Sequence, residues 1–446
     1  MIDLDDLRKR PDAYQTAAKN KNITIDVKEL LKRDEKRRKM QKELDEKRST
    51  QNAASKKIPT LKGDEKTAAL AEMKALSAKV KEGEEQLKVL ETELKTMQYM
   101  LPSIPLDRVP VGKSDKDNVE SKRAGDPSTT LRLRSGQALG VTPPKTPKDH
   151  VTLGEALGIV DIPRGAKVAG ARSYFLKGDG ARLHQAVLRF TMDELTKKGW
   201  TLFAPPLLAN EECFIGTGFF PGADQANIYA VGGQERAGAP MEPDGLHLIG
   251  TSEVTVCSYH SGETLLETDL PKRYAGYSAC FRREAGTYGK DTKGLYRVHQ
   301  FEKVEQVVLC EAHVDTAMMM FEEIRKNAED ILQALCLPYR IMDVCTGDMG
   351  KGKVFMQDIE TWMPSRGAYG ETHSCSYLGD FQARRLNIKY TTKNGEKKFV
   401  HTLNNTCIAS PRILIPILEI YQNGDGSITI PEVLRPYMAE QKIIMK

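Results

Sequence analysis

Residues 277–305 read YSACFRREAGTYGKDTKGLYRVHQFEKVE, and they predict two strands joined by a charged loop. The first β-type run ends in the Phe-Arg-Arg-Glu segment at 281–284. A loop with glycine, lysine and aspartate follows, and a second β-type run over 296–309 returns. Because no helical period lies between the two runs, we expect them to pair as antiparallel strands.

Three side chains of this stretch suit the binding of a nucleotide. Arg282, at the end of a strand and facing a loop rich in cations, is typical of an anion clamp. Phe301 offers a flat face for a base, and Glu284 can accept a hydrogen bond from an exocyclic amine. A charged surface hairpin is the alternative that these residues alone leave open.

The chain after residue 150 contains further β-type runs and two helical periods. Helical periods lie at 181–198 and 313–335, and further β-type runs lie at 200–204, 354–363 and 387–390. Strands that follow one another without helices between them favour an antiparallel sheet over a doubly wound parallel one. We therefore expect an α+β domain over 150–446, with an antiparallel β-sheet flanked by helices.

Residues 27–101 differ from the rest, since they contain no Trp or Phe and follow a heptad pattern. From Met73 onward the apolar residues recur at spacings of three and four, with Gly83 in one slot: Met73, Leu76, Val80, Leu87, Leu90, Leu94, Met97 and Leu101. Pro59 and Gly63 interrupt the pattern where a chain reversal fits. We expect an N-terminal antiparallel two-helix coiled-coil arm over about 27–100, each helix being about 50 Å long.

The first helix of this arm carries a run of basic residues, Lys36, Arg37, Arg38 and Lys39. One interpretation is a solvated helical face, and the other is contact with nucleic-acid phosphates. The local sequence leaves both open.

Composition and charge exclude several classes of protein. Hydrophobic residues make up 40% and charged residues 28% of the 446 positions, as in a globular protein, and the net charge of +5 permits a nucleic-acid partner without requiring one. No apolar run approaches the roughly 18 residues of a membrane helix, and the start MIDLDDLRKR has no apolar signal region. The eight cysteines form no CxxC motif, so we expect a reducing, cytoplasmic setting without a zinc cage.

The domain boundaries follow from a polar, proline-bearing stretch. We expect an N-terminal domain over 1–106, a linker over 107–149 with a surface insertion at 127–144, and the α+β domain over 150–446 after it. Residues 131–134 of the insertion, Leu-Arg-Leu-Arg, could form a short edge strand.

One further segment looks like a phosphate-binding loop and is rejected. Residues 347–354 read GDMGKGKV, but the eighth position of a P-loop is Ser or Thr, which binds magnesium, and here it is Val354.

Two polar clusters lie downstream. Glu371, in the segment GETHSCS at 370–376, offers a carboxylate that could hold Mg²⁺ with phosphates. In TLNNTCIASPR at 402–412, Arg412 precedes an apolar helix, and a helix start suits anions. The alternative for Asn404 and Thr406 is helix capping.

Together these segments resemble the class II aminoacyl-tRNA synthetases, and among them the bacterial-type seryl-tRNA synthetases. Residues 199–206 resemble the first motif of the class, 281–284 with 297–301 the second, and Arg412 the third, here in an Ala-Ser-Pro-Arg form. The segments typical of the seryl family are Thr251-Ser252-Glu253, 371–374, the DFQARR run at 380–385, and Thr406. The resemblance spans nearly the whole chain apart from 127–144.

The resemblance implies the class II synthetase fold and a reaction in two steps. Serine and ATP give seryl-adenylate and pyrophosphate, and serine then passes to the 3′ end of tRNA(Ser), and of tRNA(Sec) where present. It also implies ATP and Mg²⁺ but no zinc, a homodimer, and an arm that binds the tRNA through Lys36, Arg37, Arg38 and Lys39.

The same resemblance implies a role for each candidate residue. The catalytic residues are Arg282, Glu371 and Arg412. Serine is bound by Thr251, Ser252, Glu253, Arg282, Glu305, Asn404 and Thr406, with Glu305 and Thr406 on its hydroxyl and Thr251 and Glu253 on its amino group. ATP is bound by Arg282, Arg283, Glu284, Val298, Phe301, Glu371, Thr372, His373, Ser374 and Arg412. Magnesium is held by Glu371 and Ser374.

Two other functions remain as alternatives. A seryl-like ligase that loads a carrier protein is expected to lack the arm, which is complete here. A non-catalytic RNA-binding relative is expected to lose Arg282, Glu284, Glu305 or Arg412, and all four are present.

Overall fold

The structure is a computed structural model that describes residues 1–125, 146–234, 240–286 and 293–446. It divides into two compact units, 1–104 and 105–446. The predicted insertion at 127–144, including the possible strand at 131–134, lies outside the described residues.

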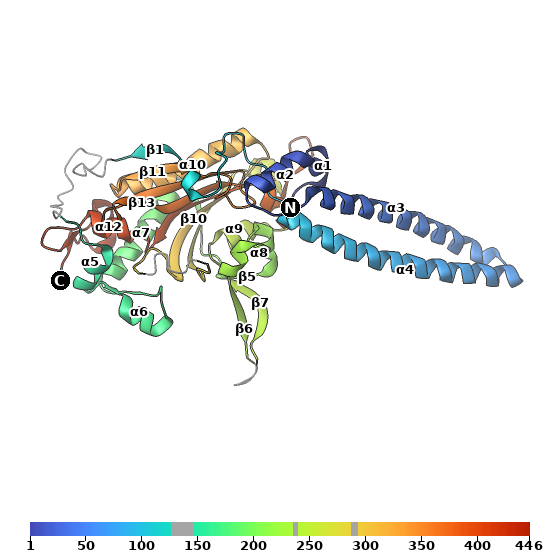
Figure 1. Ribbon diagram of the computed structural model, residues 1–446, viewed down its shortest axis with the longest axis horizontal. Coiled ribbons are helices and arrows are strands. Elements are labelled where there is room, and N and C mark those ends of the chain that lie inside the picture. The colour runs from blue at the N-terminus through green and yellow to red at the C-terminus, as the bar shows by residue number, and fades with distance from the viewer. Residues whose placement is uncertain (126–145, 235–239, 287–292) are drawn as a thin grey trace. The chain divides into compact units, whose positions relative to one another are not determined.

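The first unit contains the predicted helical hairpin. Two short helices, α1 (Leu4–Lys9) and α2 (Pro11–Asn20), precede the long helices α3 (Val27–Lys57) and α4 (Gly63–Met100). Asp26 caps α3 by accepting hydrogen bonds from two backbone amides, and a 3₁₀ turn over Ile58–Thr60 reverses the chain at Pro59. The two long helices run side by side (Figure 1).

The heptad pattern explains how the hairpin holds together. Leu44, Val80 and Leu87 are buried against one another in the seam, and Gly83 packs beneath Leu44. Ion pairs flank the seam, with Arg33 contacting Glu93 and Arg48 contacting Glu84. The predicted arm is therefore confirmed.

The second unit is built on an eight-stranded sheet in the order β1-β11-β12-β13-β16-β10-β9-β4. Its strands are β1 (Val119–Ala124), β4 (Thr201–Phe203), β9 (Lys272–Phe281), β10 (Gln300–Cys310), β11 (Tyr339–Asp343), β12 (Phe355–Met363), β13 (Ala368–Tyr377) and β16 (His401–Ser410). All neighbours pair antiparallel except β4 and β9, which are parallel. The antiparallel sheet predicted from the sequence is confirmed.

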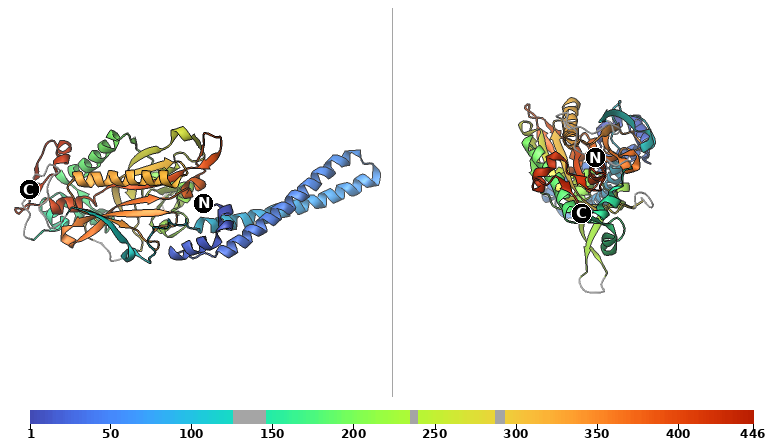
Figure 2. Two further views of the ribbon diagram at one scale, coloured as in Figure 1. Left: turned by 90° about the horizontal axis from the view of Figure 1, so that it is seen from above. Right: turned by 90° about the vertical axis from the view of Figure 1, so that its left-hand side faces the viewer.

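Helices cover this sheet and its ends (Figure 2). The long helices α7 (Asp179–Lys197) and α10 (Val314–Ala334) both pack against β16, and their apolar residues join one large core. The shorter helices are α5 (His150–Ala156), α6 (Ile162–Ala169), α8 (Glu211–Thr217), α9 (Glu253–Ser258), α11 (Phe381–Leu386) and α12 (Leu414–Ile420). None of the helices in the described part of the chain is long and apolar enough to cross a membrane.

In the described part of the chain, short strands form four smaller sheets. These are β5 (Leu208–Asn210), β7 (Glu242–Leu248) and β6 (Tyr229–Gly233); β8 (Thr264–Leu266), β14 (Lys389–Thr391) and β15 (Lys397–Phe399); β2 (Val160–Asp161) and β3 (Phe175–Leu176); and β17 (Ile428–Thr429) and β18 (Ile443–Ile444).

The stretch that the sequence marks as a linker contributes to the second unit. Residues Val119–Ala124 form β1, which pairs with β11 at the edge of the main sheet. Its side chains are largely exposed, and three of the six are charged. Charged residues are common on edge strands because they discourage pairing with other chains.

Candidate functional site

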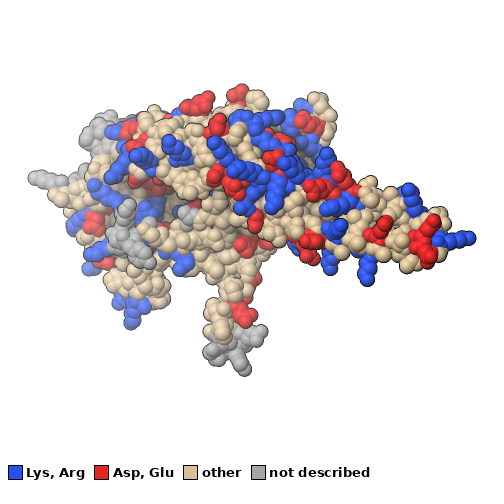
Figure 3. Space-filling model, turned by 45° about the vertical axis from the view of Figure 1, so that its right-hand side comes forward, with Lys and Arg blue, Asp and Glu red and all other residues tan. Residues whose placement is uncertain are grey.

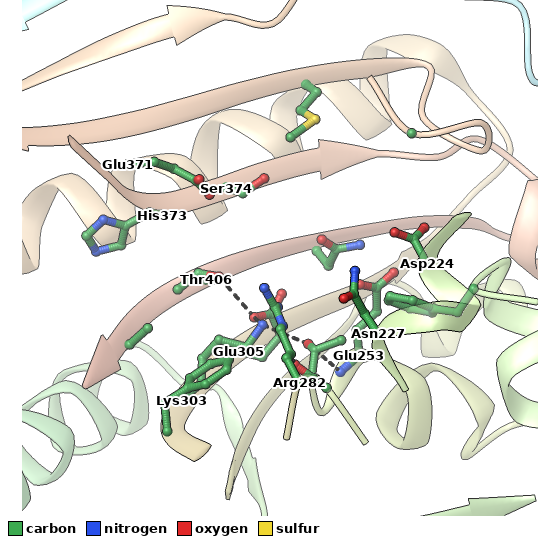
Figure 4. Close-up of a pocket in the computed structure, with 18 of the residues that line it drawn as sticks. Asp224, Asn227, Glu253, Arg282, Lys303, Glu305, Glu371, His373, Ser374 and Thr406 are labelled. Atoms are coloured by element: carbon green, nitrogen blue, oxygen red, sulfur yellow. Dashed lines mark hydrogen bonds and ion pairs between the residues drawn. The ribbon is translucent and has the colours of Figure 1, made fainter. Parts of the chain in front are cut away.

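A pocket of about 410 Å³ opens on the main sheet beside the turn between β9 and β10. Its walls come from β10, β13 and β16, from the segment around Thr217 to Ile228, and from the loop before β12 (Figure 4). This volume is in the range of small-molecule sites.

Strand alternation places three side chains of β10 in the pocket. Phe301, Lys303 and Glu305 occupy every second position of the strand, so they share one face. Glu305 and Lys303 are 2% and 5% exposed and form an ion pair. A buried carboxylate is thus neutralised by a buried ammonium group.

The neighbouring strand β16 brings Asn404 and Thr406 to the same pocket. Thr406 lies opposite Glu305 in the strand register, and its Oγ1 donates to Glu305 Oε2 at 3.3 Å (Figure 4). Cys407 is an extra residue in β16, since the register shifts between Thr406 and Ile408. This bulge allows both Thr406 and Ala409 to line the pocket, although they are three positions apart.

A second bulge shapes the wall formed by β13. The register with β12 shifts at Thr372, which is the extra residue. In an unbroken strand, Glu371 and Ser374 would face opposite sides, because they are three positions apart. With the bulge, both line the pocket.

Arg282 follows directly on β9 and enters the pocket from the turn. Its Nε donates to the Gly250 carbonyl oxygen at 3.2 Å, and its guanidinium carbon lies 5.1 Å from the centre of the Phe301 ring. A guanidinium group held this way is ready to meet an anion.

A second carboxylate, Glu253 at the start of α9, lies 8% exposed in the pocket wall. Its Oε1 accepts a hydrogen bond from Gln382 Nε2 at 2.7 Å. Burial raises the pKa of Glu253 above its usual value, while the Lys353 ammonium group opposes this shift. The pocket therefore holds two buried carboxylates with lysine side chains close to them.

Arg412 and Glu371 contact each other at another side of the pocket. Arg412 Nη1 lies 3.8 Å from Glu371 Oε2 and donates to the Glu371 carbonyl oxygen at 3.1 Å. Its Nε donates to the Tyr296 carbonyl oxygen at 3.0 Å. These contacts hold the guanidinium group at the pocket wall.

Glu284 lies beyond Arg282, where the chain turns with a positive φ of 53°. Its Oε2 lies 3.6 Å from Arg172 Nη1 and 3.5 Å from Arg297 Nη1. The carboxylate that the sequence suggests for an exocyclic amine is thus flanked by two guanidinium groups.

Two titratable side chains, His373 on β13 and Asp358 on β12, have strongly shifted pKa values. Burial lowers the pKa of His373 to about 3, so its imidazole is neutral. Burial and the nearby Glu371 charge raise the pKa of Asp358 well above its usual value. One oxygen of Asp358, Oδ1, is buried without a hydrogen-bond partner among the described residues.

Two oxygen-bearing side chains of the pocket, Glu371 and Ser374, suit a magnesium ion. Mg²⁺ is usually bound by one or two carboxylates together with phosphate oxygens and waters. The Glu371 carboxylate and the Ser374 hydroxyl both line the pocket and supply oxygen ligands of this kind, so they fit the ion. In the described part of the chain, no three His, Cys, Asp or Glu side chains gather in a metal-binding group.

Most of the predicted pocket residues line this one pocket. They are Thr251, Glu253, Arg282, Glu284, Val298, Phe301, Glu305, Glu371, Thr372, His373, Ser374, Asn404, Thr406 and Arg412. Ser252 and Arg283 are not among its lining residues. The Ser252 hydroxyl donates instead to the Gly276 carbonyl oxygen at 3.1 Å.

Other lining residues were missed by the sequence interpretation. The rejected P-loop segment supplies Asp348, Gly350, Lys351, Gly352 and Lys353 to the pocket wall. The segment runs into strand β12 rather than a helix, so it is not a P-loop. Burial lowers the pKa of Lys351 to about 8, with a further contribution from the Arg385 charge.

The basic run on α3 is largely engaged with acidic neighbours. Asp34 is fully buried and lies 3.5 Å from Arg37 and 3.3 Å from Arg38, while Lys39 lies 3.1 Å from Glu35. Burial by itself would raise the pKa of Asp34, but a hydrogen bond from Arg8 and the nearby arginine charges outweigh it and lower the pKa. Lys and Arg are interspersed with Asp and Glu on the visible face of the hairpin (Figure 3).

Comparison with known proteins covers both units. The family model of the seryl-tRNA synthetase N-terminal domain matches residues 1–105, and that of the tRNA synthetase class II core domain (G, H, P, S and T) matches residues 240–421. A serine–tRNA ligase of Deinococcus radiodurans is 43% identical over 445 residues, covering 100% of this chain and 99% of the relative.

Solved structures agree with these matches. The crystal structure of seryl-tRNA synthetase from Pyrococcus horikoshii complexed with ATP is similar with a TM-score of 0.86 and 34% identity, over 100% of this chain and 99% of that one. The cytoplasmic serine–tRNA ligase from Naegleria fowleri in complex with AMP has a TM-score of 0.80 and 30% identity, over 98% and 95%. With these likenesses over its full length, the chain belongs to the seryl-tRNA synthetase family, the class II aminoacyl-tRNA synthetases that act as serine–tRNA ligases.

Proposed function

We propose that the pocket activates L-serine with ATP to seryl-adenylate and pyrophosphate, and then transfers serine to the 3′ end of tRNA(Ser), and of tRNA(Sec) where present. The observation that carries this proposal is the buried polar set of Glu305, Thr406 and Glu253 beside Arg282. It offers carboxylates and a hydroxyl to a small polar amino acid and a guanidinium group to its carboxylate.

The activation step joins two anions. An oxygen of the serine carboxylate attacks the α-phosphorus, an O–P bond forms, and the bond to the pyrophosphate oxygen breaks. Arg282 bridges the carboxylate and the α-phosphate, and Arg412 holds the outer phosphates. No protein nucleophile is needed, so the rate gain comes from position and charge.

Magnesium has a limited role in this proposal. Glu371 and Ser374 would hold the ion, which supplies charge neutralisation at the phosphate oxygens when bound.

The adenine site is assigned to Phe301 and its neighbours. One face of the Phe301 ring is occupied by Arg282, and we assign the other face to the base. Glu284 and the backbone near Val298 would read the edge of the base, with the two arginines beside Glu284 keeping its carboxylate in place.

Selection of serine rests on its hydroxyl. Glu305 and Thr406 are buried, and alanine has no hydroxyl to make a further hydrogen bond with them, which costs binding relative to serine. Threonine carries an additional methyl group, which a tight wall would exclude.

The hairpin of the first unit is proposed to bind the tRNA through Lys36, Arg37, Arg38 and Lys39. Shape and backbone contacts dominate the recognition of RNA stems, and a pair of long helices suits this task. Phosphates would compete with Asp34 and Glu35 for these side chains.

We also propose a homodimer and a cytoplasmic location. Strand β4 lies at an edge of the main sheet, and Leu202, Leu207 and Leu208 near it are 42%, 37% and 41% exposed. Apolar side chains of this kind support an interface between two copies. Size-exclusion chromatography with light scattering on Leu202→Glu against the parent chain tests the dimer.

The function is tested by ATP–pyrophosphate exchange with each of the twenty amino acids, followed by charging of serine tRNA. We expect exchange with serine alone and none with Arg282→Ala, provided that the variant melts like the parent. Serine-dependent exchange without tRNA charging, but with loading of a carrier protein, would favour the carrier-protein alternative. A chain without exchange that binds tRNA would favour the RNA-binding alternative.

A further inference from the structure

His150, the first residue of α5, is a residue to which the sequence interpretation gives no role. Its imidazole Nδ1 lies 2.9 Å from Glu419 Oε1, and the backbone amide of Leu295 donates to its Nε2 at 3.2 Å. The side chain of His150 is only 12% exposed. His150 therefore connects two segments that are far apart in the sequence, helix α12 and the chain just before β10.

These two contacts determine which ring nitrogen of His150 carries the hydrogen. A backbone N–H group can only donate, so Nε2 accepts the hydrogen bond from Leu295. In a neutral imidazole the hydrogen then lies on Nδ1, which donates it to Glu419. The ring has one donor and one acceptor, and each has a partner in a different segment.

Glu419 is a rigid anchor for the imidazole. Its carboxylate is buried and also accepts hydrogen bonds from the backbone amide of His150 at 3.1 Å, and from the backbone amide and hydroxyl of Ser365 at 2.9 and 2.8 Å. A buried carboxylate with this set of donors keeps one orientation. Glu419 lies on α12, the helix that begins two residues after Arg412.

The chain passes very close to the other side of the imidazole. Gly294 has a φ of 85°, and a Cβ placed on it would lie 2.5 Å from His150 Nε2, so only glycine allows this approach. The next residue, Leu295, is fully buried, so its amide relies on the imidazole rather than on water. The imidazole thus fixes the position of the backbone at Leu295.

The residue after Leu295 contacts Arg412. The Tyr296 carbonyl oxygen accepts from Arg412 Nε at 3.0 Å, and the guanidinium carbon lies 4.5 Å from the centre of the Tyr296 ring. Leu295, Tyr296 and Arg412 all line the pocket. Contacts therefore lead from the imidazole of His150 to the guanidinium group of Arg412 through two successive residues.

We propose that His150 is a positioning residue that holds Tyr296 in the place where it keeps Arg412 directed at the outer phosphates of ATP. His150 is not among the described residues that line the pocket, so it acts through the Leu295 amide and not on the substrate. This inference rests on the proposed function, in which Arg412 holds those phosphates.

Two substitutions separate the roles of the two ring nitrogens. The amide nitrogen of asparagine can take the place of Nδ1, and the amide oxygen of glutamine can take the place of Nε2. His150→Asn thus keeps the donor to Glu419 and loses the acceptor for Leu295, whereas His150→Gln does the reverse.

The KM for ATP in ATP–pyrophosphate exchange should respond to only one of the two variants. His150→Asn should raise it by about tenfold, since the backbone that holds Arg412 is released, and the KM for serine should stay within about twofold of the parent. His150→Gln should lower the melting temperature at least as much, because buried Glu419 loses a donor, but should keep the KM for ATP within about twofold of the parent. A purely structural role would make the KM for ATP follow the melting temperature, and that result would overturn the proposal.

His260→Asn is the matched control. His260 is also buried and also connects a carboxylate, that of Glu263, with a second partner, the Tyr274 hydroxyl. None of these three residues lines the pocket. This variant should lower the melting temperature and leave the KM for ATP unchanged, provided that its oligomeric state matches the parent.

Ligands with and without outer phosphates test the route through Arg412. ATP and pyrophosphate carry the phosphates that are assigned to Arg412, and AMP lacks them. His150→Asn should raise the KM for ATP and the KM for pyrophosphate by similar factors, and should leave inhibition by AMP within about twofold of the parent. An equal weakening of inhibition by AMP would show that the effect does not pass through Arg412, and it would overturn the proposal.

The outcomes separate this inference from the proposed function. If the parent chain shows no serine-dependent exchange, the proposed function fails. If the parent is active but His150→Asn has the parental KM for ATP, only the inference on His150 fails. If His150→Asn does not fold, Gly294→Ala replaces it, because a methyl group there would push the chain away from the ring and leave His150 bound to Glu419. A parental KM for ATP in folded Gly294→Ala would then overturn the inference.

Discussion

His373 is an uncharged imidazole within the sheet. It is 1% exposed, and its Nδ1 lies 2.8 Å from Thr372 Oγ1. Burial lowers its pKa to about 3, whereas an unfolded chain has a histidine pKa of about 6.5. Between these two values the unfolded state therefore binds one more proton than the folded state.

We predict that this difference makes the unliganded protein sensitive to mild acid. Stability from neutral His373 is fully present above about pH 6.5 and is lost as the pH falls toward 3, by up to about 1.4 kcal/mol per pH unit. Urea unfolding at about pH 7, 6 and 5 should show a steeper decline for the parent than for His373→Gln, which has no titrating group there. Equal slopes for the two proteins would contradict the assignment.

Gln382 is buried and bonds to the pocket carboxylate of Glu253. Its amide donates to Glu253 Oε1 at 2.7 Å and to the Thr217 carbonyl oxygen at 3.1 Å, and it accepts from Thr402 Oγ1 at 2.7 Å. These contacts hold the Glu253 carboxylate in one orientation in the pocket wall. The DFQARR run thus supplies a residue, Gln382, that holds a carboxylate of the pocket wall.

We predict that Gln382→Glu raises the KM for serine by about tenfold and leaves the KM for ATP nearly unchanged, since a second carboxylate would face Glu253. Gln306→Glu is a matched control, because Gln306 is equally buried but bonds to Ile324 and Asn327 on α10. That control should lower the melting temperature without changing the KM for serine. A normal serine KM in folded Gln382→Glu would rule out this positioning role.

The pocket residues show where sequence reasoning succeeds and where it stops. Sequence motifs identify residues such as Arg282 and Glu305, because residue type and spacing alone indicate their chemistry. Lys303 could have been predicted to line the pocket, because it lies two positions before Glu305 in a strand and must share its face. The Ser252 hydroxyl bonds to the backbone of β9. This contact with a strand that is distant in the sequence could not be predicted from the residues around Ser252.

At the scale of elements, Gly83 is a weak point of the arm. It lies inside α4, where glycine costs about 1 kcal/mol relative to alanine. A Cβ placed there would lie 3.4 Å from the nearest side-chain atom of Leu44, which is ordinary contact. We predict that Gly83→Ala stabilises the hairpin by about 0.5–1 kcal/mol.

Hydrogen exchange of amides in α3 and α4, measured in the full chain, checks this prediction. Protection should increase in Gly83→Ala. Gly63→Ala is the contrasting variant, because Gly63 has a φ of 57° at the start of α4, a conformation that strains alanine. It should lower protection near the turn. Lower protection in Gly83→Ala would show that the seam has no room for the methyl group.

The elements were predictable to different degrees. The hairpin follows from a heptad pattern and one proline. Strand β12 begins one residue after the predicted start of its run at 354, whereas β10 begins at Gln300, four residues after the predicted start at 296. Strand β1 was not predicted, because VESKRA has no alternation of apolar and polar residues. It pairs with β11 through backbone hydrogen bonds and polar side-chain contacts such as that of Arg340 with Glu120, and hydrophobic patterns do not reveal such strands.

At the scale of the molecule, the described residues that line the pocket all belong to the second unit. We therefore predict that replacing residues 46–79 by a short glycine linker leaves serine-dependent exchange nearly intact. Charging of serine tRNA should fall, because the shortened hairpin offers less surface for contacts with the RNA backbone even though Lys36, Arg37, Arg38 and Lys39 remain. This cut keeps Asp34 paired with Arg8 and preserves the seam contact between Leu44 and Gly83.

Melting and oligomeric state of the shortened chain must match the parent for this comparison to count. A shortened chain that charges tRNA at the parental rate would show that the distal arm is not needed. Neutralising Arg37, Arg38 and Lys39 in the full chain should separately reduce the salt dependence of tRNA binding, by up to about three in the log–log slope.

Because of the two bulges, at Thr372 and Cys407, the site depends on the number of residues in each strand as well as on their chemistry. A substitution changes one side chain, but one residue inserted into such a strand turns every side chain beyond it to the opposite face. An insertion between Thr372 and Ser374 would place Glu371 and Ser374 on opposite faces, although no pocket residue is replaced. The strands around this pocket should therefore tolerate many replacements and few insertions, so that insertions near 372 and 407 are lost in any selection for activity.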